Sequence, residues 1–368
     1  MWFNEKHIKK HKKIKLDNLH GYVLPHAGTT YSGNILSHTL RFKPTKQFDT
    51  ILIIYLPSNN NPNVGEYYHE YYVPLKTLKQ FFPNKKYIGY NILSGTNPDI
   101  SKLNKGNTLY IISADFSHFL ELQDAIKKEN CAANSLMHKR MDISCTNVVD
   151  DIRSFNKLYE ILPDISLQWI GRTRSNTEKG VGYLSFLLRD KPNTKETPPD
   201  AFFVTAYDKN MTSRECLGNV DKWDSILETK LINDVIYKAK TTSRLTGGVN
   251  LNIPVTNYTV TYLYKDRSKQ FIRGWHAILK DSLYLPNVFL ENTYDNGLWF
   301  NSTHTKWHKG SEFNMKYTFK KLLQKSGKKL LQKSGKKLLQ KSGKISKKLN
   351  NKKYTLFYSE QIHKPINL

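Results

Sequence analysis

The sequence is poor in cysteine, lacks long hydrophobic runs and has no acidic side chain over one long stretch near its end. Its three cysteines, Cys131, Cys145 and Cys216, are too few and too scattered for a disulfide framework or a cysteine-based zinc site. A reducing compartment is therefore the simpler expectation. No run approaches the ~20 apolar residues of a membrane span, and residues 1–10 lack the apolar core of a signal peptide. We expect a soluble intracellular protein, in the cytoplasm, without a transmembrane segment.

Because the stretch near the end has no acidic residues, the positive charge is distributed very unevenly along the sequence. The formal net charge is +26, but fifteen lysines lie between Lys316 and Lys353, which leaves +11 for the rest of the chain. Three identical copies of the octapeptide KKLLQKSG span residues 320–343. On a helix the leucine pairs would drift by about 80° per copy, so they form no single stripe. Lys320–Lys344 is either a polyanion-binding tract, for instance for nucleic acid, or a recent duplication of a solvated segment.

Three apolar runs each end in polar residues of the kinds that occur in catalytic and binding sites. Residues 21–33 form a short run that ends in His26 and a glycine-rich turn, residues 49–60 end in Asn59 and Asn60, and residues 108–118 end in Asp115 and His118. Such runs are typical of strands buried on both faces. If the strands are parallel neighbours, these side chains converge on one crevice. We take His26, Asp115 and His118 as catalytic candidates. The alternatives are a hydrogen-bonded histidine beside a turn and an aspartate that caps a helix.

The chain divides at a polar stretch. Residues 1–17 form a basic N-terminal arm, residues 18–190 a first domain, residues 191–200 a proline-rich linker and residues 201–368 a second domain. We expect helices at 121–140, 146–162 and 180–188. Residues 257–264 alternate as a half-buried antiparallel strand does. The expected fold class is α/β, with a largely parallel central sheet covered by helices, followed by a smaller α+β domain.

The landmarks of the first domain resemble the Memo family. Residues 24–33, LPHAGTTYSG, are similar to its Pro-His-Ala-Gly-Tyr-x-Tyr-x-Gly signature. Four later segments resemble further landmarks in the same order, namely residues 56–60, Glu70 with Val73 and Pro74, residues 113–118, and Gly171 with Arg172. The resemblance covers roughly residues 18–190. It implies the fold of class III extradiol dioxygenases, whose active members hold non-haem iron in the crevice.

The second domain resembles the AMMECR-type domain, which is often fused to or encoded beside Memo. The matching segments are residues 202–205 and 214–218, Ser243 with Arg244, residues 274–276 with 284–288, and residues 354–360. Residues 322–327 are similar to a Leu-x-x-Lys-Ala-Gly segment of that domain, so the lysine-rich repeat is explained as this segment copied twice more. The family context implies a radical enzyme as a candidate partner.

The resemblance implies a pocket that has lost metal ligands. In Memo the pocket is lined by the first motif's histidine, a loop histidine and a cysteine; here only His26 remains, with Asn59, Asn60 and Ile170 at the other positions. Amides and isoleucine do not replace imidazole and thiolate, so we expect no tightly bound iron, copper or zinc. The alternative is a substitute set of His26, His118 and Asp115, with His69 and Glu70 as further donors. The predicted pocket comprises His26, Asn59, Asn60, Glu70, Tyr72, Asp115, His118 and Arg172.

The second domain has its own candidates, which are Arg214, Cys216, Arg244 and His276. A nearby cation would lower the pKa of the Cys216 thiol, but a buried structural cysteine is the alternative. Three hypotheses for function follow. The leading one is a binding protein, for a protein or a small-molecule ligand, with a degraded metal pocket. The second is a metal-dependent oxidoreductase of the extradiol type, and the third is a polyanion binder.

Overall fold

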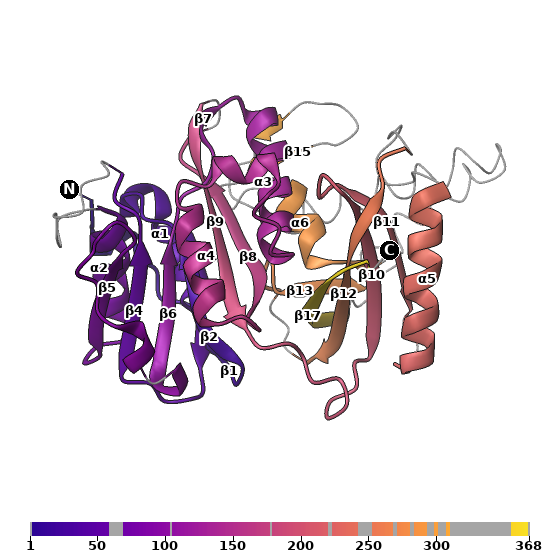
Figure 1. Ribbon diagram of the computed structural model, residues 1–368, viewed down its shortest axis with the longest axis horizontal. Coiled ribbons are helices and arrows are strands. Elements are labelled where there is room, and N and C mark those ends of the chain that lie inside the picture. Colours follow the sequence, from indigo (N-terminus) through magenta and orange to yellow (C-terminus); the bar gives the residue numbers. More distant parts are fainter. Residues whose placement is uncertain are drawn as a thin grey trace, which may run out of the picture.

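The structure is a mixed α/β fold with two large sheets (Figure 1). It is a computed structural model and describes residues 2–58, 69–103, 105–176, 179–219, 223–241, 252–267, 271–279, 283–292, 298–300, 307–309 and 355–366. Asn59, Asn60, Arg244 and the lysine-rich repeat lie outside the described residues. In the described part, no helix combines the length and the apolar composition needed to cross a membrane.

The first half of the chain alternates strands and helices. Its elements are β1 (Ile14–Leu16), β2 (Leu19–Leu24), α1 (Thr29–Thr39), β3 (Phe42–Pro44), β4 (Thr50–Tyr55), α2 (His69–Phe81), β5 (Lys86–Asn91), β6 (Thr108–Ser113), β7 (His118–Leu120), α3 (Leu122–Met137), α4 (Ile152–Ile161), β8 (Ser166–Arg174) and β9 (Gly180–Arg189). Short 3-10 helices lie at Glu5–His7, Ile100–Lys102, Lys105–Asn107 and Ser144–Val148. The expected helices at 121–140 and 146–162 therefore correspond to α3 and, after the 3-10 turn at Ser144–Val148, to α4.

The first large sheet has the order β5-β4-β6-β2-β9-β7, and β8 also pairs with β9. The pairs among β5, β4, β6 and β2 are parallel, whereas β9 is antiparallel to β2, β7 and β8. The sheet is thus mixed, which corrects the expectation of a largely parallel one. The helix expected at 180–188 is also wrong, because this segment is strand β9. A run of apolar residues buried on both faces looks alike in a strand and in a buried helix.

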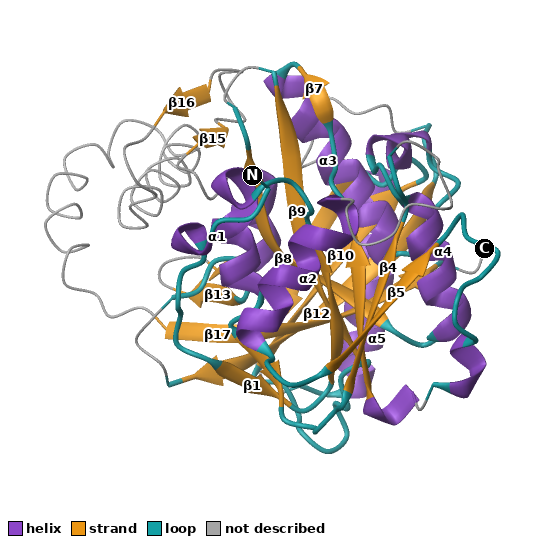
Figure 2. Cartoon of the chain, turned by 90° about the vertical axis from the view of Figure 1, so that its left-hand side faces the viewer, coloured by secondary structure: helices purple, strands orange, loops and turns teal. Residues whose placement is uncertain are grey.

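The parallel strands are covered on both faces, as their unbroken apolar runs predict. Ile51 and Ile53 of β4 pack with Leu75 and Leu78 of α2 on one face, and Leu36 of α1 joins the same cluster. The alternate β4 residues face the cluster formed with α3 and α4 on the other side. Figure 2 looks onto the side that carries α1 and α2. In β2, a Cβ atom on Gly21 would lie 1.8 Å from the Tyr110 carbonyl oxygen, so only glycine fits there.

The second large sheet is antiparallel, with the order β11-β10-β12-β17-β13-β14. The elements of this half are β10 (Ala201–Asp208), β11 (Ser213–Asn219), α5 (Ser225–Thr241), β12 (Val255–Asp266), β13 (His276–Leu279), β14 (Leu283–Tyr284), α6 (Pro286–Asn292), the hairpin β15 (Leu298–Phe300) and β16 (Trp307–Lys309), and β17 (Thr355–Pro365). Helix α5 covers one face through Val235 and Ala239. In this strand order the last strand along the chain, β17, lies inside the sheet between β12 and β13.

Polar contacts join the two sheets. Arg189 of β9 forms an ion pair with Glu360 of β17, with 2.5 Å between Nη2 and Oε1. Gln168 of β8 donates a hydrogen bond to the Ser359 carbonyl oxygen. The described part of the basic arm, residues 2–17, packs on the first half of the chain: β1 pairs with β3, and the Lys9 amide donates to the Ser37 hydroxyl.

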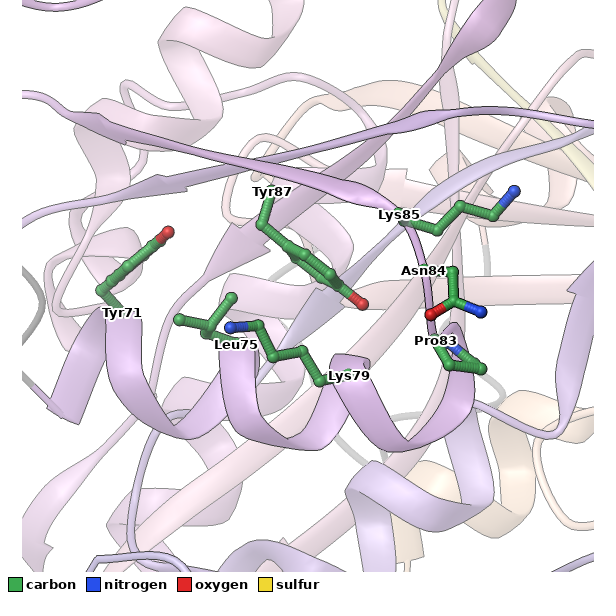
Figure 3. A pocket seen from close by; sticks show the side chains of 7 residues that line it. All are labelled: Tyr71, Leu75, Lys79, Pro83, Asn84, Lys85 and Tyr87. Carbon is green, nitrogen blue, oxygen red and sulfur yellow. The ribbon is translucent and has the colours of Figure 1, made fainter.

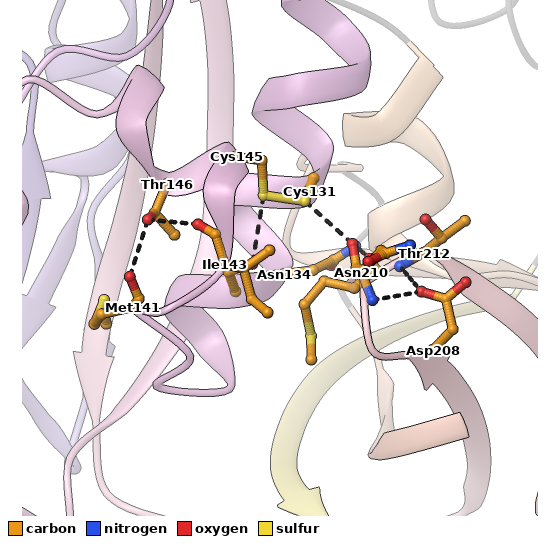
Figure 4. Close-up of a disulfide and its surroundings, with 11 residues drawn as sticks. Cys131, Asn134, Met141, Ile143, Cys145, Thr146, Asp208, Asn210 and Thr212 are labelled. Atoms are coloured by element: carbon orange, nitrogen blue, oxygen red, sulfur yellow. Dashed lines mark hydrogen bonds between the residues drawn. A yellow bond between two sulfur atoms is a disulfide. The ribbon is translucent and has the colours of Figure 1, made fainter. Parts of the chain in front are cut away.

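A disulfide joins Cys131 of α3 to Cys145 in the 3-10 turn before α4 (Figure 4). Three cysteines are too few for a disulfide framework, as the sequence indicates, but two of them do pair. The reason is tertiary: α3 and the turn fold back on each other and bring two cysteines that are 14 positions apart in sequence to a Cα separation of 6.0 Å. Cys216 takes no part in a disulfide.

Candidate functional site

The C-terminal ends of β2 and β6 bring His26 and Asp115 together. The two strands are parallel neighbours, so the loops that follow them leave the sheet at the same edge. The His26 amide donates to Asp115 Oδ1 at 2.9 Å, and both side chains are buried. Helix α3 begins only at Leu122, so Asp115 holds the loop after β2 and does not cap a helix.

The His26 ring is fixed between a serine and an aspartate. The Ser113 hydroxyl donates its proton to the Glu70 carbonyl oxygen, so it accepts a hydrogen bond from His26 Nδ1 at 3.0 Å. His26 Nε2 lies 3.0 Å from Asp150 Oδ2 and 3.8 Å from Asp115 Oδ2. Because Nδ1 carries a proton, Nε2 is the ring atom that is available for a second proton or for a metal ion.

The carboxylates around His26 favour its charged form. Burial disfavours the imidazolium, but Asp115, Asp150 and Glu70 outweigh burial and raise the pKa of His26 to about 10. Burial also raises the pKa of Asp115 to about 6, although the positive charge of His26 opposes this shift. At neutral pH His26 is therefore an imidazolium whose second proton points at Asp150.

Helix α2 supplies two more donors at its first residues. His69 Nδ1 lies 3.4 Å from Glu70 Oε2, and the His69 ring meets the His26 ring edge-on with 5.2 Å between centroids. Glu70 is only 1% exposed. Its Oε1 accepts a hydrogen bond from the Ser58 amide, but its Oε2 accepts none from any described residue. A buried carboxylate oxygen without a hydrogen-bond donor is costly unless a cation faces it.

The N-terminal segment covers part of this cluster. The Trp2 indole stacks on the His69 ring, with 4.6 Å between centroids and an interplanar angle of 14°. The backbone there is held because the Thr29 amide donates to the Trp2 carbonyl oxygen at 2.9 Å. His69 and Asp150 each keep 26% of their side-chain surface exposed, so solvent reaches the cluster at these two residues.

Two groups of side chains in the described structure have the spacing of metal ligands. One contains His26, His69 and Glu70, and the other contains His26, Asp115 and Asp150. In each group the donor atoms lie within 4.8 Å of one another. Since Nδ1 of the shared His26 is bound to Ser113, both groups must use Nε2. They are therefore two sides of one site.

Three other predicted pocket residues of the described structure belong to neither ligand group. His118, on β7, is exposed and belongs to neither ligand group, so the substitute set of His26, His118 and Asp115 is not among the described clusters. Tyr72 packs beside the core on α2. Arg172 is fully buried, where it forms an ion pair with Glu129 of α3 and donates to the Leu290 carbonyl oxygen.

Sequence reasoning missed Asp150. The structure shows that Asp151 caps α4 by accepting from the Ser154 amide, while the preceding Asp150 turns toward His26 and accepts from the Asp115 amide. The signal was the pair of adjacent aspartates before an amphipathic helix: one is enough for the cap, and the other has no local role.

The candidate site residues of the second half of the chain each contact different residues. Arg214 donates to the Ile253 carbonyl oxygen and forms an ion pair with Asp208, which fits a structural role. The Cys216 thiol accepts from the Thr205 hydroxyl at 3.4 Å. His276 Nδ1 accepts from the Ile272 amide, so His276 Nε2 donates to Asp266 at 2.6 Å.

No known protein family matches this chain, and no curated protein matches it.

Proposed function

We propose that the protein binds a divalent transition-metal ion between His26, His69 and Glu70. The observation that carries the proposal is Glu70 Oε2, a buried carboxylate oxygen that lies 3.4 Å from His69 Nδ1 and accepts no hydrogen bond from the described residues. A metal ion would satisfy this oxygen. Two histidines and one carboxylate suit iron, zinc or copper, whereas magnesium and calcium prefer oxygen ligands alone.

The residues around the ligands support this role. The Ser113 hydroxyl fixes the His26 ring and, through the Glu70 carbonyl, the start of α2, so two ligands are oriented together. Metal binding must displace the proton on His26 Nε2, and Asp150 is placed to accept that proton. Asp115 holds the His26 backbone.

Elemental analysis of variants tests the proposal. Protein loaded with Fe²⁺, Zn²⁺ or Cu²⁺ and then desalted should keep one metal ion per chain. His26→Ala, His69→Ala and Glu70→Gln should each lose most of it. His118→Ala is the matched control, because His118 is an exposed histidine outside the cluster, and should keep it. Wild-type protein that retains none of the three metals would contradict the proposal. Loss in both His26→Ala and His118→Ala, with the metal kept in His69→Ala and Glu70→Gln, would favour the substitute set instead.

A second candidate is the oxidoreductase of the extradiol dioxygenase type on a Memo-like framework. It is favoured by the two-histidine, one-carboxylate donor set, which resembles that of non-haem iron oxygenases. The contacts between residues of the first and fourth Memo-like landmarks, and between residues of the second and third, also support it. Bound iron would supply a site for O₂ and a catechol. The test is O₂ uptake by Fe²⁺-loaded protein on adding catechol, and iron binding without uptake would leave a binding protein.

A further inference from the structure

A hollow lies on the first half of the chain between helix α2 and the strand β5. It has a volume of about 490 Å³, which falls within the range of small-molecule sites. Tyr71, Leu75 and Lys79 follow one another along α2, Tyr87 of β5 lies across from them, and Asn84 and Lys85 close one end (Figure 3). The metal-ligand candidates His69 and Glu70 are at the start of α2, so this hollow is a separate feature.

Two tyrosine rings form rigid walls. Tyr71 is 7% exposed and packs on Tyr55, with 5.2 Å between ring centroids. A Cβ atom on Gly89 would lie 3.0 Å from the Tyr71 ring, so the glycine lets this ring lie close against β5. The Tyr87 hydroxyl donates to the Phe82 carbonyl oxygen at 2.7 Å, which fixes the second ring. Both rings are therefore in place before any ligand arrives, and this lowers the entropic cost of binding.

The charge of the hollow is positive. Among the described residues, Lys79 and Lys85 line it and no acidic side chain does. Lys85 is already engaged, because its Nζ donates to the Phe48 carbonyl oxygen. Lys79 is exposed, and its amine turns back along the helix toward Leu75, 5.6 Å from the Tyr87 ring centroid (Figure 3). Lys79 is thus the cation that a ligand in the hollow would meet.

We propose that this hollow binds a small anion that carries a flat aromatic ring, of the size of a nucleoside monophosphate. The ring would stack on Tyr87 and contact Leu75, and the anionic group would pair with Lys79 next to the Asn84 amide. Stacking of a base on one aromatic side chain is a modest contribution to affinity, so neither the ring nor the anion suffices alone. The chemistry is shared by nucleotides and by aromatic phosphates or carboxylates of similar size.

Isothermal titration calorimetry of the full chain with AMP tests the proposal. We expect saturable 1:1 binding, with adenosine and inorganic phosphate each binding at least about tenfold more weakly, which is about 1.4 kcal/mol. Phenyl phosphate, which keeps a ring and the anion, distinguishes a general aromatic anion from a nucleotide: equal binding assigns the broader class. Lys79→Ala should weaken AMP binding about tenfold.

A control and a second variant keep the test specific. Lys76→Ala removes a lysine of the same helix that lies over Tyr72 and does not line the hollow, so it should leave the affinity unchanged. Tyr87→Ala removes the ring on which the base would stack, so it should weaken AMP binding as Lys79→Ala does. No saturable AMP binding up to about 1 mM, unchanged binding in Lys79→Ala, or equal weakening in Lys76→Ala would overturn the proposal.

Discussion

Two histidine clusters in this protein have opposite electrostatics. In the first, His26 is surrounded by Asp115, Asp150 and Glu70, which raise its pKa to about 10 against the effect of burial. In the second, His138 at the end of α3 meets His363 of β17, with 4.9 Å between ring centroids. Burial lowers the pKa of His138 well below its usual value and that of His363 to about 4.

The second cluster is held by a neutral hydrogen-bond network. Thr259 Oγ1 of β12 lies 3.0 Å from His138 Nε2 and 2.9 Å from His363 Nδ1. The charged groups that act on the two rings are cations, Arg140 on His138 and Lys139 on His363, and they add to the effect of burial. Both rings therefore stay uncharged where the two sheets meet.

The comparison shows that burial alone does not determine what a histidine can do. Burial acts on both clusters in the same direction, and the carboxylates at the strand ends reverse its effect at His26. A charged His26 beside several carboxylates can exchange its proton for a metal ion. The neutral pair at the junction offers a contact that acid will weaken.

Breaking the disulfide should have the largest effect, because it supports the segments that carry both clusters. Cys131 precedes His138 on α3, and Cys145 precedes Asp150. For a loop of this length, Cys131→Ser with Cys145→Ser should lower the free energy of unfolding by about 3 kcal/mol. Urea denaturation measures this change, and Cys216→Ser is the control. Titration of unreduced, denatured protein should find one thiol; three thiols would contradict the pairing.

Removing one carboxylate from the first cluster should show how much that carboxylate raises the pKa of His26. In Asp150→Asn the pKa of His26 should fall by roughly 1–3 units, because an opposite charge at hydrogen-bond distance is lost. NMR titration of the ring measures it, with the exposed Asp124→Asn as control. A raised folded-state pKa stabilises the fold fully below about pH 6.5, and this stabilisation is lost as the pH rises through about 10. The Asp150→Asn variant should lose this stabilisation at a lower pH than wild type does. An unchanged His26 pKa would show that Asp150 is not the partner of His26.

A smaller effect than that of breaking the disulfide is expected in acid, where protonation of the second cluster should destabilise the fold. Because the folded-state pKa of His363 is lowered to about 4, the unfolded chain takes up a proton first as the pH falls below about 6.5. The free energy of unfolding should therefore fall by about 2–3 kcal/mol between pH 6.5 and 4. His363→Gln should lose less over this range than wild type, whereas the exposed His118→Gln should follow wild type. Equal losses in both variants would refute the assignment.

The strands around the site were predictable from sequence, but its ligand set was not. The apolar runs that end near His26, Asn59 and Asp115 are indeed the neighbouring parallel strands β2, β4 and β6. Periodicity could not tell that residues 180–188 form a strand, since a segment covered on both faces has no polar side to report. Nor could it choose His69 over His118, because the choice depends on where α2 begins relative to β2.

The sequence by itself determined the buried parallel strands, the histidine at the end of one of them and the strong charge asymmetry of the chain. These follow from local patterns of apolar, turn-forming and charged residues. Only the tertiary structure decided that Asp150 and His69 meet His26, that Cys131 pairs with Cys145, and that His138 and His363 stay neutral. Each of these depends on distances between segments far apart in the chain, and on the surrounding charge and burial.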